Sequence, residues 1–443
     1  MDPPSRAKFS DVGTFGFELE FLVYLSESNT KTREAIPSDQ QALQEPYDSL
    51  NIGGGDHELH VKRLHHFGAE IAAKLTEAGI ATAYKEKGHP KVDDAPKLNQ
   101  EDARLGSFDE FCYSSYKKCT IVPEETMIWT DPNKNRMAVR PETEKGHFWL
   151  GFEFVSKVYQ YRDLHSMKLQ LETVCKELRA NYSVSINAGK DSMHGSSRCS
   201  VHVHWGVSGK EYSLLSVKRI LTLMWVTEDT LMGLHATWRR DAKKYSALLQ
   251  QGTNMAADKV SNLPGWIDNL GKGDWSDEME QNIPARVRDS LHENKPKVQW
   301  IWRAGTIDDL VMLVGEVNKS RRASVAITEL LPADSDFTGK VRRSQLNTIE
   351  FRHMQGSLNP ALVSAWIEVT ASIMRRCIDM SAQDFTSFME DISACVSNKN
   401  SSVQDLLDQL GIAPEIRSIF RSFDQKYLDK EADSRSSVFL PGL

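Results

Sequence analysis

The stretch FGFELEF, residues 15–21, constrains the fold of this chain most. It alternates between apolar residues and two glutamates, Glu18 and Glu20, and successive side chains of a β-strand point to opposite faces of a sheet. The pattern therefore predicts a strand that buries aromatic side chains on one face and places both carboxylates on the other. A solvated face of an antiparallel sheet explains this pattern, and so does a pair of metal ligands. Only other strands can separate these interpretations.

Composition and charge narrow the class of protein. The chain has 443 residues, of which 40% are hydrophobic, and it carries a net charge of −7. Such a chain can bury a large core, and its interspersed acids and bases argue against a nucleic-acid-binding surface. No segment has the pattern of a secretion signal or a membrane span, and the six cysteines form no C-x-x-C pair. We therefore expect a globular, cytoplasmic protein with reduced thiols.

Periodicity predicts both helices and strands along the chain. Apolar residues recur at three- and four-residue steps in four segments, which predicts helices at 57–78, 162–182, 211–236 and 361–380. Alternating patterns predict strands at 81–85, in KKCTIVPEETM, at 147–159, in SRCSVHVHWGV and in LNTIEFRHM. Polar or Pro/Gly-rich segments, at 26–56, 86–110 and 253–300, read as loops or insertions. Strands and helices do not alternate regularly, which favours an α+β fold with an antiparallel sheet.

Three of these strands carry acids or histidines among apolar residues. Glu153 lies in GFEFVS, His202 and His204 alternate with apolar residues in VHVHWG, and Glu350 and Arg352 share one face of TIEFRH. Taken alone, each is explained by an edge carboxylate or by an ion pair on a wet face. The coincidence of four such strands in one sheet favours a joint ligand set, namely Glu18, Glu20, Glu153, His202 and Glu350, with Arg352 beside it.

Four carboxylates and one imidazole suit hard divalent cations. Mg²⁺ and Mn²⁺ bind carboxylate oxygens and accept an imidazole while leaving positions for water and phosphate oxygens, whereas Zn²⁺ prefers a compact set of nitrogen and sulfur ligands. The set therefore predicts a site for two or three Mg²⁺ or Mn²⁺ ions. An adjacent arginine would make such a site suitable for phosphoryl transfer from ATP, because cations neutralise the charge on the transferred group.

Four motifs in this order resemble those of the amidoligase family: GFELEF, GFEFVS, VHVHWG and TIEFRHMQGSLNP. The resemblance covers roughly residues 12–375. It implies a carboxylate–amine ligase with a glutamine synthetase-like fold, in which an antiparallel sheet backed by helices forms a curved catalytic face. On this basis we expect a catalytic domain over residues 1–380, with peripheral insertions at about 26–56 and 253–300, and a peripheral helical extension over residues 381–443.

The resemblance also implies a role for individual residues. Those expected to bind metal ions are Glu18, Glu20, Glu153, His202 and Glu350. Arg352 would contact the transferred phosphate, and His204 would support the catalytic site from behind the ligands. ATP would phosphorylate a small carboxylate substrate, an amino acid or a peptide, and a bound amine would attack the acyl carbon to form an amide.

Other cations are candidates for binding the nucleotide. In WRRDAKKYS, Arg239 or Arg240 takes the place of a family arginine that would bind nucleotide phosphate or substrate carboxylate, and a solvated basic face is the structural alternative. The segment RRASVAITEL, residues 321–330, departs from the family because it lacks the usual asparagine, which bears on the substrate pocket. Arg322 in this segment is a further candidate for the cofactor.

Two other functions are compatible with these residues. A protein of the same fold could bind nucleotide and metal without turnover, and a metal-dependent hydrolase could use a similar ligand set. Phosphate release distinguishes them, because a ligase needs ATP and both substrates whereas a hydrolase acts without ATP.

Overall fold

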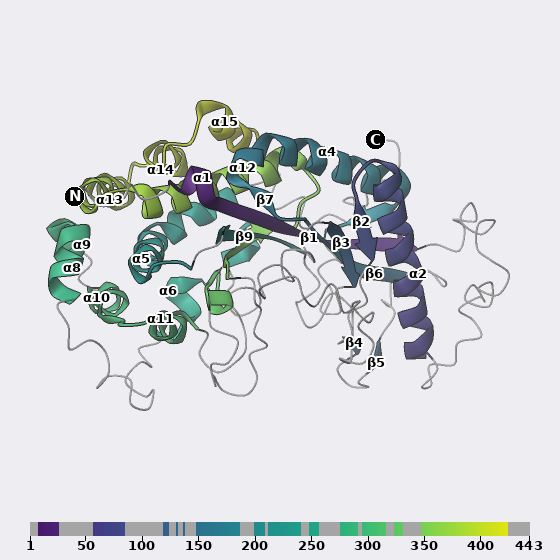
Figure 1. The fold of residues 1–443 in the computed structure, drawn as a ribbon, viewed down its shortest axis with the longest axis horizontal. Helices are drawn as coiled ribbons and strands as arrows, with labels where there is room; N and C mark the ends of the chain where they lie inside the picture. Colours follow the sequence, from purple (N-terminus) through teal and green to yellow (C-terminus); the bar gives the residue numbers. More distant parts are fainter. Residues whose placement is uncertain are drawn as a thin grey trace, which may run out of the picture.

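A computed structural model gives the arrangement of the chain (Figure 1). It describes residues 8–25, 56–84, 118–123, 130–131, 136–137, 148–186, 199–208, 211–240, 248–256, 275–290, 295–315, 323–330 and 347–423. The predicted loop at 86–110 lies outside these residues, as does the predicted loop at 26–56 except for its last residue, Asp56, which begins α2 (Asp56–Glu77). The described part contains a nine-stranded sheet and a small two-stranded sheet of β4 (Thr130–Asp131) and β5 (Arg136–Met137).

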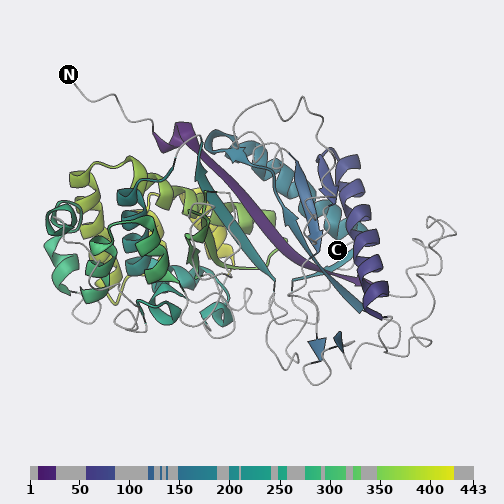
Figure 2. The same ribbon diagram turned by 60° about the horizontal axis from the view of Figure 1, so that its bottom comes forward.

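The large sheet is mainly antiparallel, as the sequence predicts. Its strands follow the order β10 (Val325–Ala326), β11 (Ile349–Gln355), β9 (Ser200–Val207), β1 (Gly13–Leu25), β6 (Phe148–Val155), β3 (Cys119–Pro123) and β2 (Thr82–Tyr84). Two short strands, β7 (Tyr159–Gln160) and β8 (Ser183–Ser185), also pair with β1. Only β2 and β3 are parallel. The long strand β1 crosses the middle of the sheet (Figure 2) and pairs directly with β6, β7, β8 and β9.

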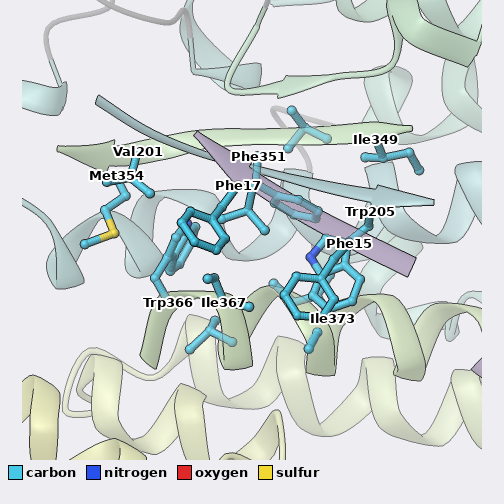
Figure 3. Close-up of a cluster of buried hydrophobic side chains, with 14 of the residues drawn as sticks. Phe15, Phe17, Val201, Trp205, Ile349, Phe351, Met354, Trp366, Ile367 and Ile373 are labelled. Carbon is cyan, nitrogen blue, oxygen red and sulfur yellow. The ribbon is translucent and has the colours of Figure 1, made fainter. Parts of the chain in front are cut away.

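The aromatic face of the sheet packs on helix α12 (Pro360–Asp379). Figure 3 shows Phe15 and Phe17 of β1 beside Trp366 and other apolar side chains of α12. The indole nitrogen of Trp205 donates a hydrogen bond of 2.9 Å to the hydroxyl of Thr370, which satisfies a polar atom inside this core. The other face of the same strands, which carries the acids, is thereby left for the site.

The four predicted helices are all present. Besides α12 they are α2 (Asp56–Glu77), α4 (Leu164–Asn181) and α5 (Leu214–Leu231). Helices α4 and α12 lie against each other on one side of the sheet (Figure 1). Among the described helices, none combines the length and the apolar composition that crossing a bilayer requires.

Further helices pack on α5, whose side chains are buried along most of its length, or on the neighbours of α5. They are α6 (Leu249–Gly252), α8 (Trp275–Asn282), α9 (Ala285–Ser290), α10 (Lys295–Arg303), α11 (Ile307–Val314), α13 (Ala382–Ser397), α14 (Val403–Gln409) and α15 (Pro414–Ser422). Shorter turns of helix are α1 (Phe9–Val12), η7 (Tyr161–Asp163), η8 (Met232–Leu234), η9 (Thr237–Arg240) and η11 (Thr328–Leu330).

Two segments are less peripheral than the sequence predicts. Residues 253–300 contain α8, α9 and the start of α10, and Met279 and Val298 belong to the hydrophobic core. The C-terminal helices bury Phe385 and Leu406 in the same core. Helices α8 and α9 are short and have few apolar residues among polar and charged ones, so their apolar stripe is visible only once the helix is placed. The domain boundary at residue 380 stays a prediction.

A β-bulge interrupts the pairing of β11 with β9. Phe351 pairs with Val203, but Met354 rather than His353 pairs with Val201, so one extra residue lies on β11. Just beyond this strand the N–H of Gly356 donates a 2.7 Å hydrogen bond to the carbonyl of Cys199.

Candidate active site

Cross-strand pairing brings the predicted ligands together on the polar face of the sheet. The pairs of directly opposed residues are Glu18 with His202, Glu20 with Glu153, and Glu350 with His204. Opposed residues of antiparallel strands place their side chains side by side on one face. The four strands of the sequence-based prediction are therefore adjacent, and they form one continuous row of acids and imidazoles.

Glu18 lies at the centre of this row. Its Oε2 is 2.9 Å from Nδ1 of His202, and its Oε1 is 3.2 Å from Nε2 of His204. Burial by itself would raise the pKa of Glu18, but the attraction of His204 and the hydrogen bond to His202 outweigh it and hold that pKa well below its usual range. The carboxylate is therefore ionised, as a ligand for a cation must be.

The imidazole of His204 lies beside the negative charge of Glu18. Burial lowers the pKa of its imidazole, but the carboxylates of Glu18 and Glu350 more than compensate, and the net pKa is raised. Its Nδ1 lies 3.3 Å from the hydroxyl of Thr348, which orients the ring so that Nε2 is turned toward Glu18. A metal-binding histidine usually has such a partner on its second nitrogen.

Two groups of side chains have the spacing of metal ligands. One consists of Glu18, His204 and Glu350, and the other of Glu18, Glu153 and His202, and within each group the ligand atoms lie within 4.8 Å of one another. The Nε2 atoms of both histidines are buried and face carboxylates: that of His204 is 3.2 Å from Oε1 of Glu18, and that of His202 is 3.8 Å from Oε1 of Glu20. Carboxylate oxygens combined with imidazole nitrogens fit Mg²⁺ or Mn²⁺. Because Glu18 belongs to both groups, it could bridge two ions.

Glu20 belongs to neither group. Its Oε2 accepts a 2.6 Å hydrogen bond from the backbone N–H of Ser200, and its Oε1 lies 3.8 Å from Nε2 of His202. The carboxylate thus lies at the border of the cluster, and its role as a ligand stays a prediction.

Arg352 lies on β11, two residues after Glu350. Its guanidinium forms an ion pair with the fully buried carboxylate of Glu350, while 22% of the Arg352 side chain is exposed. Burial lowers the pKa of Arg352, but Glu350, Glu20 and Glu18 outweigh that effect and the pKa is raised. A permanent, partly accessible cation therefore lies beside the ligand groups, where the sequence places it.

The other arginines that the sequence suggests for nucleotide binding are Arg239, Arg240 and Arg322. Arg239 is buried, which rules out a solvated basic face at this position. Its guanidinium donates to the carbonyls of Arg352 and His353 and to the hydroxyl of Ser200. The side chain of Arg240, and Arg322 altogether, lie outside the described residues.

Three further residues contribute to the site, and the sequence-based analysis does not include them. Ser200 and Thr348 contact Glu20 and His204, and both lie two residues before a predicted ligand, so the strand period would have placed them on the correct face. Glu329 is buried in η11, and its charge helps to raise the pKa of His204. No periodic pattern in the sequence marks Glu329, because it lies in a turn.

A comparison with protein families gives a match over the part of the chain that contains β1, β6 and β9. The model of the family described as "Putative amidoligase enzyme" matches residues 12–252, more than half of the chain. The chain therefore belongs to this amidoligase family, as its motifs predict. No curated protein and no solved structure gives a significant match.

The family match ends before β11. It includes every predicted ligand on β1, β6 and β9, but Glu350 and Arg352 lie beyond residue 252. The pairing of β11 with β9 brings these two residues to the other predicted ligands.

Proposed function

We propose that this protein is an ATP- and Mg²⁺-dependent carboxylate–amine ligase that forms an amide bond through an acyl phosphate. One observation carries the proposal: a single sheet face holds two carboxylate–imidazole groups beside Arg352, in a member of the amidoligase family. The mainly antiparallel sheet with helices on its apolar face is compatible with a glutamine synthetase-like fold.

The ligand groups suit the binding of ATP through metal ions. When bound, two or three Mg²⁺ or Mn²⁺ ions would reduce the negative charge of the phosphate oxygens. Glu18 would contribute to both groups, with His204 and Glu350 on one side and Glu153 and His202 on the other. Arg352 would contact the phosphoryl group during its transfer, because its fork of N–H donors matches phosphate oxygens.

The reaction has two steps. An oxygen of the substrate carboxylate attacks the γ-phosphorus, the bond from that phosphorus to the bridging oxygen breaks, and ADP leaves. The amine nitrogen then attacks the acyl carbon, the bond to the phosphate oxygen breaks, and an amide and inorganic phosphate are released. We expect the substrates to be small: an amino acid or peptide as the carboxylate, and an amine.

A substrate screen tests this proposal. ADP release is measured with Mg²⁺, ATP and pairs of amino acids and polyamines, and mass spectrometry identifies the product. A ligase releases ADP only when both substrates are present, in a one-to-one ratio with an amide. Hydrolysis of a substrate without ATP would show a metal-dependent hydrolase. Nucleotide binding without ADP release for any pair would show a binding protein.

Arg352→Lys tests the role of the guanidinium once a substrate pair is known. Lysine keeps the charge but lacks the planar fork, so we expect ADP formation in a single turnover to slow by about 10³-fold, or about 4 kcal/mol, while the Kd for ATP changes much less. The wild-type rate in Arg352→Lys would show that Arg352 only neutralises Glu350.

A further inference from the structure

The bulge in β11 lies directly behind the site and changes the hydrogen bonding of its backbone. At a bulge two residues of one strand oppose a single residue of the other, so the ladder is locally interrupted. Here the interruption falls between Phe351 and Met354, which includes Arg352 itself. The direction of the Arg352 side chain therefore depends on how this irregular backbone is held.

Arg239, which lies in η9, holds this backbone. Its Nε donates a 3.0 Å hydrogen bond to the carbonyl of His353, and Nη2 donates to the carbonyl of Arg352. Its Nη1 donates a 3.0 Å hydrogen bond to Oγ of Ser200 on β9. A planar guanidinium can satisfy three acceptors in fixed directions, which a lysine ammonium cannot reproduce.

A second contact holds the same residues from α5. The N–H of Arg352 donates a 2.8 Å hydrogen bond to the carbonyl of Ser324, and the hydroxyl of Ser324 donates to the carboxylate of Glu228. Nε2 of His353 lies 3.0 Å from the same carboxylate. Glu228, His353 and Ser324 are all buried, so the bulge has little freedom to move.

The hydrogen bonds of Arg239 also lead to the metal ligands. Ser200 accepts from Arg239 through its hydroxyl and donates through its backbone N–H to Oε2 of Glu20, at 2.6 Å. One series of hydrogen bonds therefore joins Glu20 on β1, Ser200 on β9 and the backbone of Arg352 on β11. In this series Arg239 connects β9 to β11.

We infer that Arg239 is a positioning residue: it fixes the backbone of Arg352 so that the Arg352 guanidinium meets the transferred phosphate, and it does not bind the nucleotide itself. The inference rests on the proposed function and replaces the sequence-based prediction that Arg239 binds the cofactor. The position of Arg352 at the transferred phosphate would then depend on a residue that faces the protein interior.

The test compares Arg239→Lys with Arg219→Lys. Arg219 is an equally buried arginine, whose Nη1 donates to the carbonyl of Met380 at 2.7 Å and whose Nε donates to Asn282 at 2.9 Å, on the helical side of the protein. Both variants lose a buried guanidinium, so a general loss of stability affects both. Three properties are measured: amide hydrogen exchange of peptides covering β11, the Kd for ATP, and kcat for ADP formation.

We expect Arg239→Lys to speed exchange in residues 351–355 and to lower kcat by about 10- to 100-fold, because small misplacements of a reacting group cost that much. The Kd for ATP should change less than about threefold, since no nucleotide contact is lost. Arg219→Lys should leave β11 exchange and kcat near the wild-type values. Ser200→Ala, which removes only one of the three acceptors, should give a smaller effect in the same direction.

Two results would overturn the inference. A tenfold or larger loss of ATP affinity in Arg239→Lys would show that Arg239 contacts phosphate, and unchanged exchange across β11 would show that Arg239 does not hold the bulge. The exchange and binding measurements need no turnover. If the wild-type protein forms no ADP with any substrate pair, the proposed function fails while the exchange result still decides whether Arg239 holds β11.

Discussion

Glu18→Gln should weaken two ion sites at once, because Glu18 alone belongs to both ligand groups. Glutamine keeps the shape of the side chain and removes its charge. Loss of a residue that merely orients a metal ligand costs about 10- to 100-fold in affinity, which we take as the lower limit for loss of a ligand. Over two sites, Glu18→Gln should cost about 10²- to 10⁴-fold in the product of the Kd values, or about 3–6 kcal/mol.

Glu153→Gln and Glu350→Gln should each affect one site. Each residue belongs to a single group, so the expected loss is about 10- to 100-fold, or about 1.4–3 kcal/mol, in one Kd and near zero in the other. Titration with Mn²⁺, followed by electron paramagnetic resonance, counts the free and bound ions directly. Glu368→Gln is the matched control. Glu368 forms an ion pair with Lys168, with 2.7 Å between Oε1 and Nζ, and this pair joins α12 to α4 outside the site.

Comparing the Mn²⁺ affinities of the three variants tests whether Glu18 is shared by two ion sites. If Glu18→Gln weakens only one ion, or no more than Glu153→Gln does, Glu18 is not shared and the two-group geometry is not the metal site. Thermal unfolding without metal checks that every variant is folded.

Three further predictions concern other features of the structure. His202→Ala and His204→Ala should each weaken Mn²⁺ binding by about tenfold or more in the same titration, since each residue supplies the only imidazole of its group. If only His202→Ala weakens binding, His204 has the supporting role that the motifs imply. Gly356→Ala should destabilise the protein by about 1–3 kcal/mol in urea unfolding, because a Cβ atom there would lie 2.9 Å from the carbonyl carbon of Cys199; wild-type stability would show that the strands shift freely. Burial raises the pKa of the Cys175 thiol to about 12, so the folded protein should not be labelled there by a thiol reagent at pH 8, whereas urea should permit labelling, and rapid labelling of the folded protein would contradict this burial.

The sequence indicates which side chains the structure brings together on one face, because they follow the strand period. Glu18 and Glu20, like His202 and His204, lie two residues apart, so each pair must share a face if the segment is a strand. What the period leaves open is the order and register of the strands. The structure provides both, since the opposed pairs depend on which strands are neighbours.

The features that escape prediction depend on contacts between distant residues. Nothing in EFRHMQ marks the bulge after Phe351, because its backbone is held by Arg239 and Ser324, more than a hundred and more than twenty residues earlier in the chain. The helices between 275 and 303 are similarly hidden, because short amphipathic segments are stable only when a neighbour covers their apolar stripe. The positioning role that we infer for Arg239 rests on its contacts with β9 and β11, whereas its residue type alone suggests phosphate binding.

Strand β1 is synthesised before the two long strands that pair with it. Strands β6 and β9 begin at residues 148 and 200, and β11, which pairs with β9, begins at 349. At ribosomal rates of about 5–20 residues per second, β1 waits roughly 6–35 seconds for β6 and β9 with an apolar face and two open edges. Charged side chains on such a strand oppose pairing with other nascent chains. We therefore predict that Glu18 and Glu20 also oppose aggregation of the unfinished chain, so that neutral residues at these positions should lower the soluble yield independently of any effect on metal binding.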